Sequence, residues 1–351
     1  MSLHFYWMIG EIIVVILVLS LVILRLWRNA KLKTAKPVLP ETPGGKAVYF
    51  VKYILRILGA GAAALAGFIV FISLERAAFS VITETVPAPS DVAIPPNLGF
   101  DVEEVTFESE DGITLAGWFA PSRNDATIIL LHGYGGNRTG MIWHAQQLTD
   151  TGYGVLMYDE RASGESAGDY RSYGWEDHLD VKAAVQFIHS QNPDEHIGAA
   201  GCSTGASIVV YSAALYPEIE AAWGDGNSSV RAQDLPKPQN PLMAIIIGNN
   251  YVIDWLYAVK LGIEAPAPLV EILPDIAPRP VMFVGGGTEI PLLGSEGDLY
   301  TLRYAEIAGP NAQAWVIPEA AHCDGPFQRP EEYSQKMVSF FDEAFGINRQ
   351  P

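Results

Sequence analysis

The stretch IGAAGCSTGASIVVYSAALY, residues 197–216, decides the fold of this chain. Its first four residues are small and apolar, as in a buried strand, and residues 206–216 predict an apolar helix. Between them, residues 201–205 read Gly-Cys-Ser-Thr-Gly, the pattern G-x-S-x-G. A serine on a strand-to-helix turn of this kind projects its oxygen above the sheet, and the glycines give the turn room. We therefore predict that Ser203 is a nucleophile. The alternative is a plain glycine-rich turn.

The segments around this turn predict an α/β fold. Residues 102–108 and 114–119 alternate as strands around an Asp111-Gly112 hairpin turn. Further short apolar strands are predicted at 127–131, 154–158, 197–200, 219–223, 280–284 and 314–317, and helices at 140–149, 176–190 and 331–345. Two antiparallel strands followed by strand–helix alternation predict a mostly parallel sheet covered by helices on both faces. Active sites on such sheets lie at the carboxyl ends of the strands.

A serine hydroxyl needs a base, and His322 is the predicted one. It follows the last predicted strand, in the loop PEAAHCDGP (318–326). The chain order of nucleophile, acid and histidine is the order that α/β sheets with this turn use. His132 lies in the glycine-rich loop and is expected to orient that loop. The remaining candidates are expected to be structural or solvated: His144, His178, His189 and His196.

The tetrahedral intermediate of acyl transfer needs preorganised N–H donors. The loop LHGYGG (131–136) follows a buried strand, and we assign the oxyanion hole to the backbone N–H groups of Tyr134 and Thr204. A phosphate-binding loop is the alternative, but neither G-x-x-x-x-G-K-[ST] nor G-x-G-x-x-G occurs here.

Together, LHGYGGNR (131–138), YDERASGES (158–166), GCSTG and the late histidine resemble the α/β-hydrolase superfamily. Within it, the chain is similar to bacterial membrane-anchored hydrolases and their relatives, over about residues 100–345. The resemblance implies an α/β-hydrolase fold and esterase, lipase, thioesterase or peptidase chemistry through an acyl-enzyme. The family pattern D-x-R-G-x-G-x-S appears here at residues 159–166 with Ala162 in place of the usual glycine.

The carboxylate that orients His322 has four candidates. Relatives carry an aspartate just after the strand here predicted at 280–284, where this chain has Glu289 at the matching spacing. Glu296 follows seven residues later, at a position where some relatives carry a glutamate. We weigh Glu289 and Glu296 equally and ahead of Asp298 and Asp225. Each is equally compatible with a helix cap or a surface carboxylate.

Two apolar runs near the N-terminus predict transmembrane helices at about 8–27 and 53–74. The basic residues between them predict that this connection is cytoplasmic, so that the catalytic domain is extracytoplasmic. A cleaved signal peptide is the weaker alternative for the first run, because the basic residues follow it. The expected organisation is a multi-pass anchor over 1–79, a proline-rich linker over 80–100, and a hydrolase domain over 101–347 with a lid at about 226–278.

Charge divides the chain in the same way. Residues 1–76 hold 9 Lys/Arg and 3 Asp/Glu, whereas residues 77–351 hold 13 and 37. A domain this acidic argues against a nucleic-acid partner. No cofactor and no metal are expected, since no Cys/His cluster has ligand spacing. Cys202 and Cys323 each border a catalytic candidate, either as small buried side chains or in a redox role.

The lid segment is apolar and aromatic, and either packs onto the domain or contacts an apolar substrate. We therefore expect a membrane-anchored serine hydrolase. Its partners would be a small-molecule or lipid ester substrate and the lipid bilayer, entered by two transmembrane helices. The alternatives are a peptidase or thioesterase of the same fold, or a binding protein on a hydrolase fold that has lost its activity.

Overall fold

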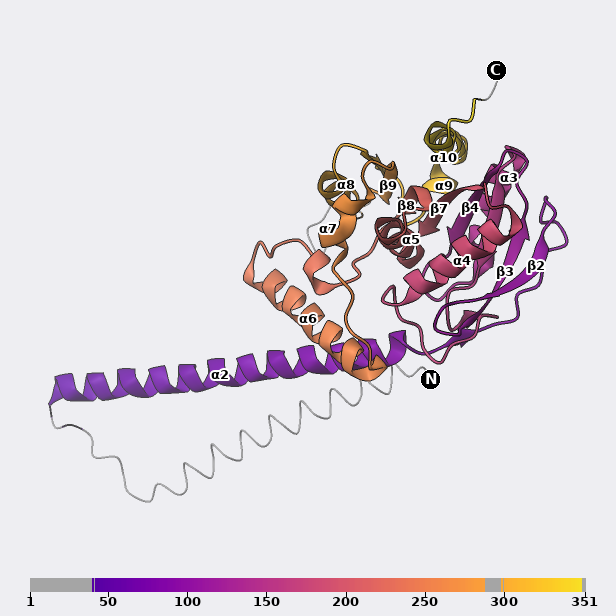
Figure 1. Ribbon diagram of the computed structural model, residues 1–351. Coiled ribbons are helices and arrows are strands. Elements are labelled where there is room, and N and C mark those ends of the chain that lie inside the picture. The colour runs from indigo at the N-terminus through magenta and orange to yellow at the C-terminus, as the bar shows by residue number, and fades with distance from the viewer. Residues whose placement is uncertain (1–39, 41, 288–297, 299, 349–351) are drawn as a thin grey trace. The chain divides into compact units, whose positions relative to one another are not determined.

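The computed structural model describes residues 40, 42–287, 298 and 300–348 (Figure 1). The chain divides into two compact units, Met1–Val70 and Phe71–Pro351. The boundary falls inside helix α2 (Pro43–Glu84), and the sheet and the candidate site belong to the second unit.

The second unit contains a mixed eight-stranded sheet in the order β10-β9-β8-β7-β4-β5-β3-β2. β2 and β3 form an antiparallel hairpin, β3 pairs antiparallel with β5, and all other neighbours are parallel. The predicted mostly parallel sheet and its Asp111-Gly112 hairpin are confirmed. The strand bounds are β2 (Glu103–Glu108), β3 (Thr114–Ala120), β4 (Ala126–Leu131), β5 (Gly154–Tyr158), β7 (His196–Cys202), β8 (Ile219–Asp225), β9 (Val281–Gly286) and β10 (Ala312–Ile317).

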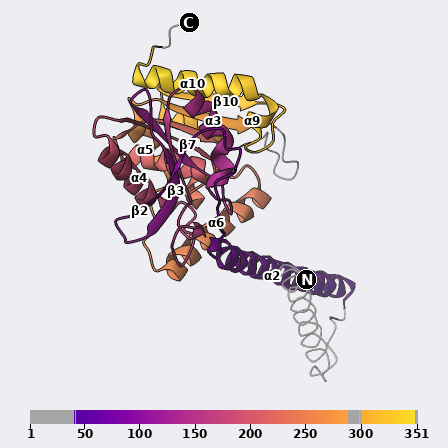
Figure 2. The ribbon, with the colours of Figure 1, turned by 90° about the vertical axis from the view of Figure 1, so that its right-hand side faces the viewer.

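Helices cover both faces of this sheet (Figures 1 and 2). One apolar cluster joins the sheet to α4, α5, α7 and α8, and a second joins the other face to α3 and α10. The central strand β4 is buried along its whole length, because both faces of a parallel sheet are covered. The bounds are α3 (Ile142–Asp150), α4 (Asp177–Gln191), α5 (Thr204–Leu215), α7 (Leu269–Ile272), α8 (Thr301–Ala308), α9 (Gly325–Gln328) and α10 (Pro330–Phe345).

Helix α2 is the one described helix that is long and apolar enough to cross a membrane, with an exposed window of mean hydropathy 2.3. It includes the span predicted at 53–74 but continues to Glu84. The extension forms because Ala77 and Val81 are buried, and Val81 belongs to the core cluster of α4 and α5. The first predicted span, at about 8–27, lies outside the described residues.

The predicted linker at 80–100 is not a free spacer. Its first residues are helical, and the short strand β1 (Ala88–Pro89) pairs in parallel with β6 (Ser163–Gly164). Val92 and Leu98 are buried as well. Backbone pairing and apolar burial thus dock this proline-rich segment on the hydrolase unit.

The predicted lid contains one long helix, α6 (Pro241–Leu261). Gly248-Asn249-Asn250, three residues of low helix propensity, lies within it. The helix has strong ends, because the Asn240 side chain accepts from the Met243 N–H and Gly262 terminates it at φ 71°. These ends and tertiary packing outweigh the low helix propensity of three central residues.

Candidate active site

Ser203 lies alone between the end of β7 and the start of α5, at φ 58° and ψ −118°. A left-handed backbone is strained for a residue with a Cβ. Close packing explains the two glycines, since a Cβ on Gly201 would lie 2.4 Å from the Gly205 backbone, and one on Gly205 would lie 2.4 Å from the His132 carbonyl oxygen. The turn therefore has the tight geometry that the sequence pattern predicts.

His322 lies in the loop after β10, with Nε2 2.9 Å from the Ser203 hydroxyl oxygen. Its side chain is half exposed, at 51%. A neutral ring that donates from Nδ1 presents Nε2 as an acceptor, so the serine hydroxyl can donate its proton there. The structure thus brings the two residues singled out from the sequence into hydrogen-bond contact.

Asp298 supplies the carboxylate at the other ring nitrogen. Its Oδ1 lies 2.7 Å from His322 Nδ1, and its Oδ2 accepts from the Gly286 N–H at 2.8 Å. The hydrogen bond that His322 donates to Asp298 raises the pKa of His322 above its ordinary value, although partial burial opposes this. From the sequence, Asp298 ranked behind Glu289 and Glu296, and both glutamates lie outside the described residues.

Asp225, the fourth candidate, is directed elsewhere. Its side chain is buried and its Oδ2 accepts from the Tyr333 hydroxyl at 2.9 Å. Burial raises the pKa of Asp225 to about 6. Its backbone carbonyl accepts from the Ser203 N–H at 2.8 Å, so Asp225 helps to hold the turn instead of the imidazole.

The predicted oxyanion loop lies beside Ser203 because Leu131, at the end of β4, is the register partner of Gly201. A Cβ built on Gly133 would be 3.2 Å from that of Ser203, so the loop backbone passes directly over the nucleophile. Tyr134 follows in this loop, and Thr204 is the first residue of α5, where N–H groups have no helical acceptor.

His132 lies beneath this loop and is buried. Its Nε2 accepts from the Glu160 N–H at 3.1 Å, and its Nδ1 lies 2.8 Å from the Gly133 carbonyl. Burial lowers the pKa of His132 and favours the neutral ring. These contacts agree with the orienting role expected for this residue.

The side chain of Tyr134 contacts Glu84, the last residue of α2, and is linked through Arg171 to the segment just after it, contacts that no sequence pattern predicts. Arg171 donates from Nη2 to the Tyr134 hydroxyl at 2.9 Å, and its guanidinium lies 4.2 Å from the ring centroid. Arg171 Nε also donates to the Val86 carbonyl at 2.6 Å, and the Tyr134 hydroxyl lies 3.4 Å from the Glu84 carbonyl. No local motif connects these distant positions in the sequence.

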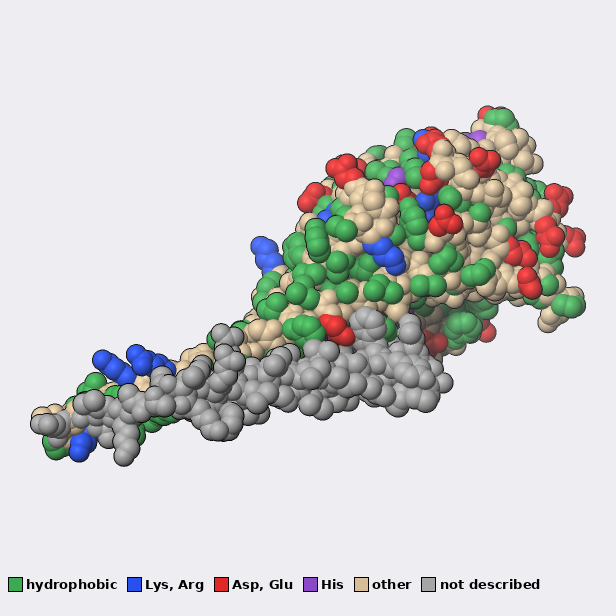
Figure 3. Space-filling view, turned by 90° about the horizontal axis from the view of Figure 1, so that it is seen from below, with side chains coloured by type: hydrophobic (Ala, Val, Ile, Leu, Met, Phe, Trp, Pro, Cys, Tyr) green, Lys and Arg blue, Asp and Glu red, His purple; other side chains and the backbone are tan. Residues whose placement is uncertain are grey.

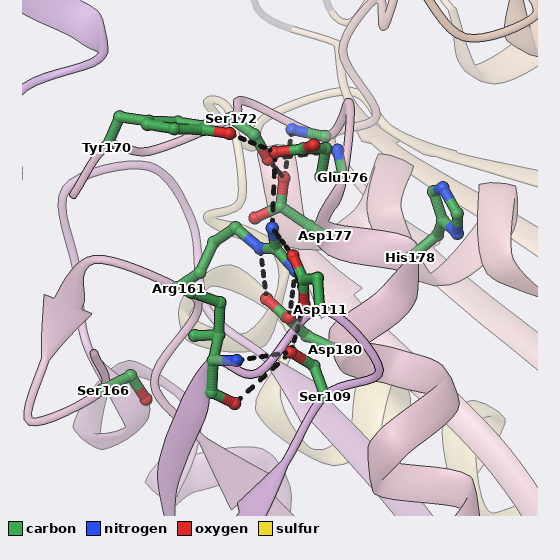
Figure 4. A network of polar contacts seen from close by, with 12 residues as sticks. Ser109, Asp111, Arg161, Ser166, Tyr170, Ser172, Glu176, Asp177, His178 and Asp180 are labelled. Carbon is green, nitrogen blue, oxygen red and sulfur yellow. Dashed lines mark hydrogen bonds and ion pairs between the residues drawn. The ribbon is translucent and has the colours of Figure 1, made fainter. Parts of the chain in front are cut away.

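Figure 4 shows a buried ionic network around Arg161, in the family-like segment 159–166. The guanidinium donates to Asp180 at 2.6 and 3.0 Å and to Asp111 at 2.9 Å, and Glu176 lies 3.4 Å away. It therefore joins the β2–β3 hairpin to the start of α4. The next residue, Ala162, has φ 57°, the conformation that favours the glycine expected there.

Cys202 and Cys323 are both free and half-buried. The Cys323 thiol lies 3.4 Å from the Asp225 carbonyl, and Cys202 is the register partner of Asp225. A hydrogen bond with Cys202, together with burial, raises the pKa of the Cys323 thiol. A thiol kept protonated reacts slowly, which agrees with small packing side chains.

A cavity of about 150 Å³ lies between the end of α2, α6 and the loop after β8. Aromatic side chains connect it to the oxyanion loop, because Tyr134 packs on Tyr173 with centroids 5.4 Å apart and Tyr173 lies 6.5 Å from Tyr257. Tyr257 donates from its hydroxyl to Glu84 Oε2 at 2.7 Å. The cavity is thus lined by aromatic side chains on one part and by polar and charged groups, among them Glu84, Arg231 and Asp254, on another.

Comparison with known proteins adds family evidence. A family model described as serine aminopeptidase, S33, matches residues 122–224. The chain is 26% identical over 262 residues to the uncharacterized protein YfhR of Escherichia coli O157:H7, which covers 70% of this chain and 82% of YfhR.

Two solved structures are informative. The esterase Pf2001 of Pyrococcus furiosus has a TM-score of 0.57 at 23% identity and covers 74% of this chain and 98% of its own. A bacterial membrane phospholipase A has a TM-score of 0.51 at 18% identity and covers 84% and 99%. At these identities the likeness shows a shared fold.

Proposed function

The chain belongs to the α/β-hydrolase superfamily, and from this premise we propose that it is a membrane-anchored serine hydrolase that cleaves acyl esters. The observation that carries the proposal is the hydrogen-bonded series of Ser203, His322 and Asp298, with separations of 2.9 and 2.7 Å. A serine held on a strained turn against a base, which is itself oriented by a carboxylate, is the arrangement of an activated nucleophile.

The proposed reaction proceeds in two halves. Ser203 Oγ attacks the ester carbonyl while His322 Nε2 takes its proton, and Asp298 stabilises the imidazolium that forms. The N–H groups of Tyr134 and Thr204 stabilise the oxyanion. His322 then protonates the departing alcohol, which leaves an acyl group on Ser203. A water molecule, deprotonated by His322, releases the acid and restores the hydroxyl.

An apolar acyl group is the substrate part that fits this site. The aromatic series from Tyr134 to Tyr257 offers apolar surface beside the oxyanion loop, and it leads to a cavity whose lining is partly polar. The fold likeness to an esterase and to a phospholipase A supports ester substrates, lipid esters among them.

Membrane anchoring belongs to the same proposal. The apolar helix α2 supports one span, and the second span is proposed from the sequence at 8–27. The excess of basic residues before Ile57 supports a cytoplasmic connection and an extracytoplasmic hydrolase unit.

A fluorophosphonate probe tests the chemistry in the full-length protein. We expect it to label wild type, Cys202→Ala to retain most of the labelling, and Ser203→Ala to abolish it. Mass spectrometry of the labelled peptide should locate the probe on Ser203. Equal labelling of Ser203→Ala, or no labelling of folded wild type, would refute the proposal.

A peptidase is the second candidate, because the matching family model is described as a serine aminopeptidase. Turnover of short acyl esters and of peptide amides with a free N-terminus separates the two. We expect kcat/KM to be higher for the esters by at least about 100-fold, a difference of about 3 kcal/mol in transition-state stabilisation.

A further inference from the structure

Helix α6 is apolar on its exposed face as well as on the face that packs against the core, to which Tyr257 and Ile253 belong. Its exposed face carries large apolar side chains, which we call the α6 stripe: Ile245, Tyr251, Trp255 and Val259, exposed by 41, 50, 62 and 61%. At 100° per residue these positions fall within one sector of the helix. Hydrophobic side chains cover much of the face in Figure 3, whereas acidic ones gather toward its rim.

Two polar residues of α6, Asn250 and Asp254, face the cavity, whereas Lys260 near its end is exposed. Asp254 forms an ion pair with Arg231 at 2.9 Å, and Asp254 and Asn250 both line the cavity described above. Asp254 is the one carboxylate in the sequence of α6, so no unpaired negative charge accompanies the stripe. An exposed apolar face of this size marks a surface that meets another phase or another molecule.

The helix is attached to the end of the proposed membrane span. Tyr257 donates to Glu84, the Lys260 ammonium donates to the Thr85 hydroxyl, and Val81 and Tyr257 share one core cluster. The apolar run of α2 ends at Leu74, and Val81 follows seven positions later in the same helix, a rise of about 10 Å. α6 therefore joins α2 close to where the chain would leave the hydrocarbon.

We propose that the α6 stripe lies in the headgroup layer of the bilayer that holds α2, so that the hydrolase unit takes its ester substrate from the lipid surface. The inference rests on the proposed membrane anchoring and ester hydrolysis. Tyr and Trp are the side chains that membrane–water interfaces favour, because they combine an apolar ring with a polar tip. Interfacial helices bury an apolar face of this kind at the boundary of headgroups and acyl chains.

In this placement the two sides of α6 have different functions. The stripe would contact lipid, while the opposite side encloses the cavity together with Tyr173 and Trp175. An acyl chain that leaves the bilayer beside α6 would meet apolar surface on its way to the oxyanion loop.

The first experiment compares two substrates with the full-length protein in phosphatidylcholine vesicles. A double variant, Tyr251→Ser with Trp255→Ser, should reduce turnover of a long-chain acyl ester embedded in the vesicles by about tenfold or more. Its turnover of soluble p-nitrophenyl butyrate should stay within about twofold of wild type. Leu302→Ser and Phe327→Ser are matched controls, since these side chains are 66 and 70% exposed on α8 and α9, and they should change neither rate.

The second experiment measures contact with lipid directly and needs no turnover. Acyl chains brominated near the carbonyl should quench part of the tryptophan fluorescence of wild type, and Trp255→Phe should remove a measurable share of that quenching. Trp315→Phe, on β10, should remove none.

The outcomes separate this inference from the proposed function. If no ester is hydrolysed by wild type while Trp255 is quenched, the function fails and the lipid contact stands. If esters are hydrolysed but the double variant retains full activity on vesicles and Trp255 is not quenched, the lipid contact is overturned. A change in oligomer mass of the double variant without quenching would assign the stripe to a second copy and also overturn it.

Discussion

One hydrogen bond joins Ser203 and His322, and the negative charge of Asp298 sets the tautomer of His322 and stabilises its protonated form. The Asp298 carboxylate accepts from His322 Nδ1 and is itself fixed by the Gly286 N–H. Asp298→Asn removes the charge and allows the wrong imidazole tautomer, so we expect kcat to fall by about 10³- to 10⁴-fold with the fold retained. Steady-state kinetics together with circular dichroism test this expectation.

Asp298→Asn should also change the pH dependence of kcat/KM. The base must be neutral to accept the serine proton, so kcat/KM of wild type should fall as the pH drops through the raised pKa of His322. In Asp298→Asn, burial without the hydrogen bond should move this limb to lower pH. Glu289→Gln and Glu296→Gln are the controls. Loss of activity in either, with none in Asp298→Asn, would assign the acid to a glutamate.

Asp225 offers a stability test. In the folded state burial raises the pKa of Asp225 to about 6, above its unfolded value, so the folded protein holds this proton longer. Stability therefore falls as the pH rises from about 4 to about 6, by about 3 kcal/mol from this group, and stays lower above that range. Asp225→Asn should flatten this pH slope in urea unfolding monitored in mild detergent. An unchanged slope would contradict the prediction.

The acid was the part of the site that the sequence could not identify. Ser203 and His322 are marked by local patterns, the strand–turn–helix pattern around Ser203 and the position of His322 after the last strand. Nothing local marks Asp298, because spacing alone does not show which of the carboxylates after β9 reaches the imidazole. Asp298 is positioned by a hydrogen bond from its N–H to the Gly286 carbonyl, twelve positions earlier in the chain. The spacing of residues in the sequence does not predict this contact.

The strand–turn–helix element around Ser203 depends on glycine at two places. Gly205→Ala would drive a Cβ into the backbone of residues 131 and 132, which cannot move without displacing β4. We expect a loss of about 3 kcal/mol or more in unfolding free energy, and loss of activity. Gly248→Ala on α6 is the control, since nothing lies within 4 Å, and it should stabilise by about 0.5–1 kcal/mol.

The contact between Arg171 and Tyr134 joins the oxyanion loop to the end of α2. Arg171→Met keeps the length of the side chain but removes both hydrogen bonds, so the loop should lose its fixed position. We expect kcat to fall about tenfold with little change in KM, because oxyanion donors act mainly in the transition state. Tyr134→Phe keeps the aromatic ring beside the Arg171 guanidinium, so its kcat should fall less than that of Arg171→Met.

Arg123→Met is the matched control for that experiment, since Arg123 donates to the Thr149 carbonyl at 2.6 Å in another part of the unit. Full activity of Arg171→Met, or an equal loss in Arg123→Met, would show that the loop does not depend on this contact.

Elements with strong periodicity were predicted well, and those that depend on docking were not. The hairpin β2–β3 and the buried strands β4 and β7 follow from alternation and from short apolar runs. By contrast, α2 continues past Leu74 because Val81 packs into the core of the hydrolase unit. The proline-rich segment is held because β1 pairs with β6. Both features depend on packing against residues far away in the sequence, so a local sequence pattern does not predict them.

At the scale of the whole molecule, charge follows the division of the chain. Three of the four basic residues described on α2 lie in its first third, at Lys46, Lys52 and Arg56, and the fourth is Arg76. The segment from 77 onward carries 37 carboxylates against 13 basic residues. An acidic surface favours solubility and repels anionic headgroups, so contact with lipid would be confined to the uncharged α6 stripe.

This asymmetry predicts the orientation of the chain in its membrane. Basic residues remain on the cytoplasmic side, so the C-terminus of a chain with two spans should lie outside. Alkaline phosphatase fused after Pro351 should be active, and a green fluorescent protein at the same place should be dark. Replacing Lys46, Lys52 and Arg56 by Gln should increase the fraction of chains with the opposite orientation. A bright fluorescent fusion with an inactive phosphatase would place the hydrolase unit in the cytoplasm, where Ser203 would meet lipid esters of the inner leaflet.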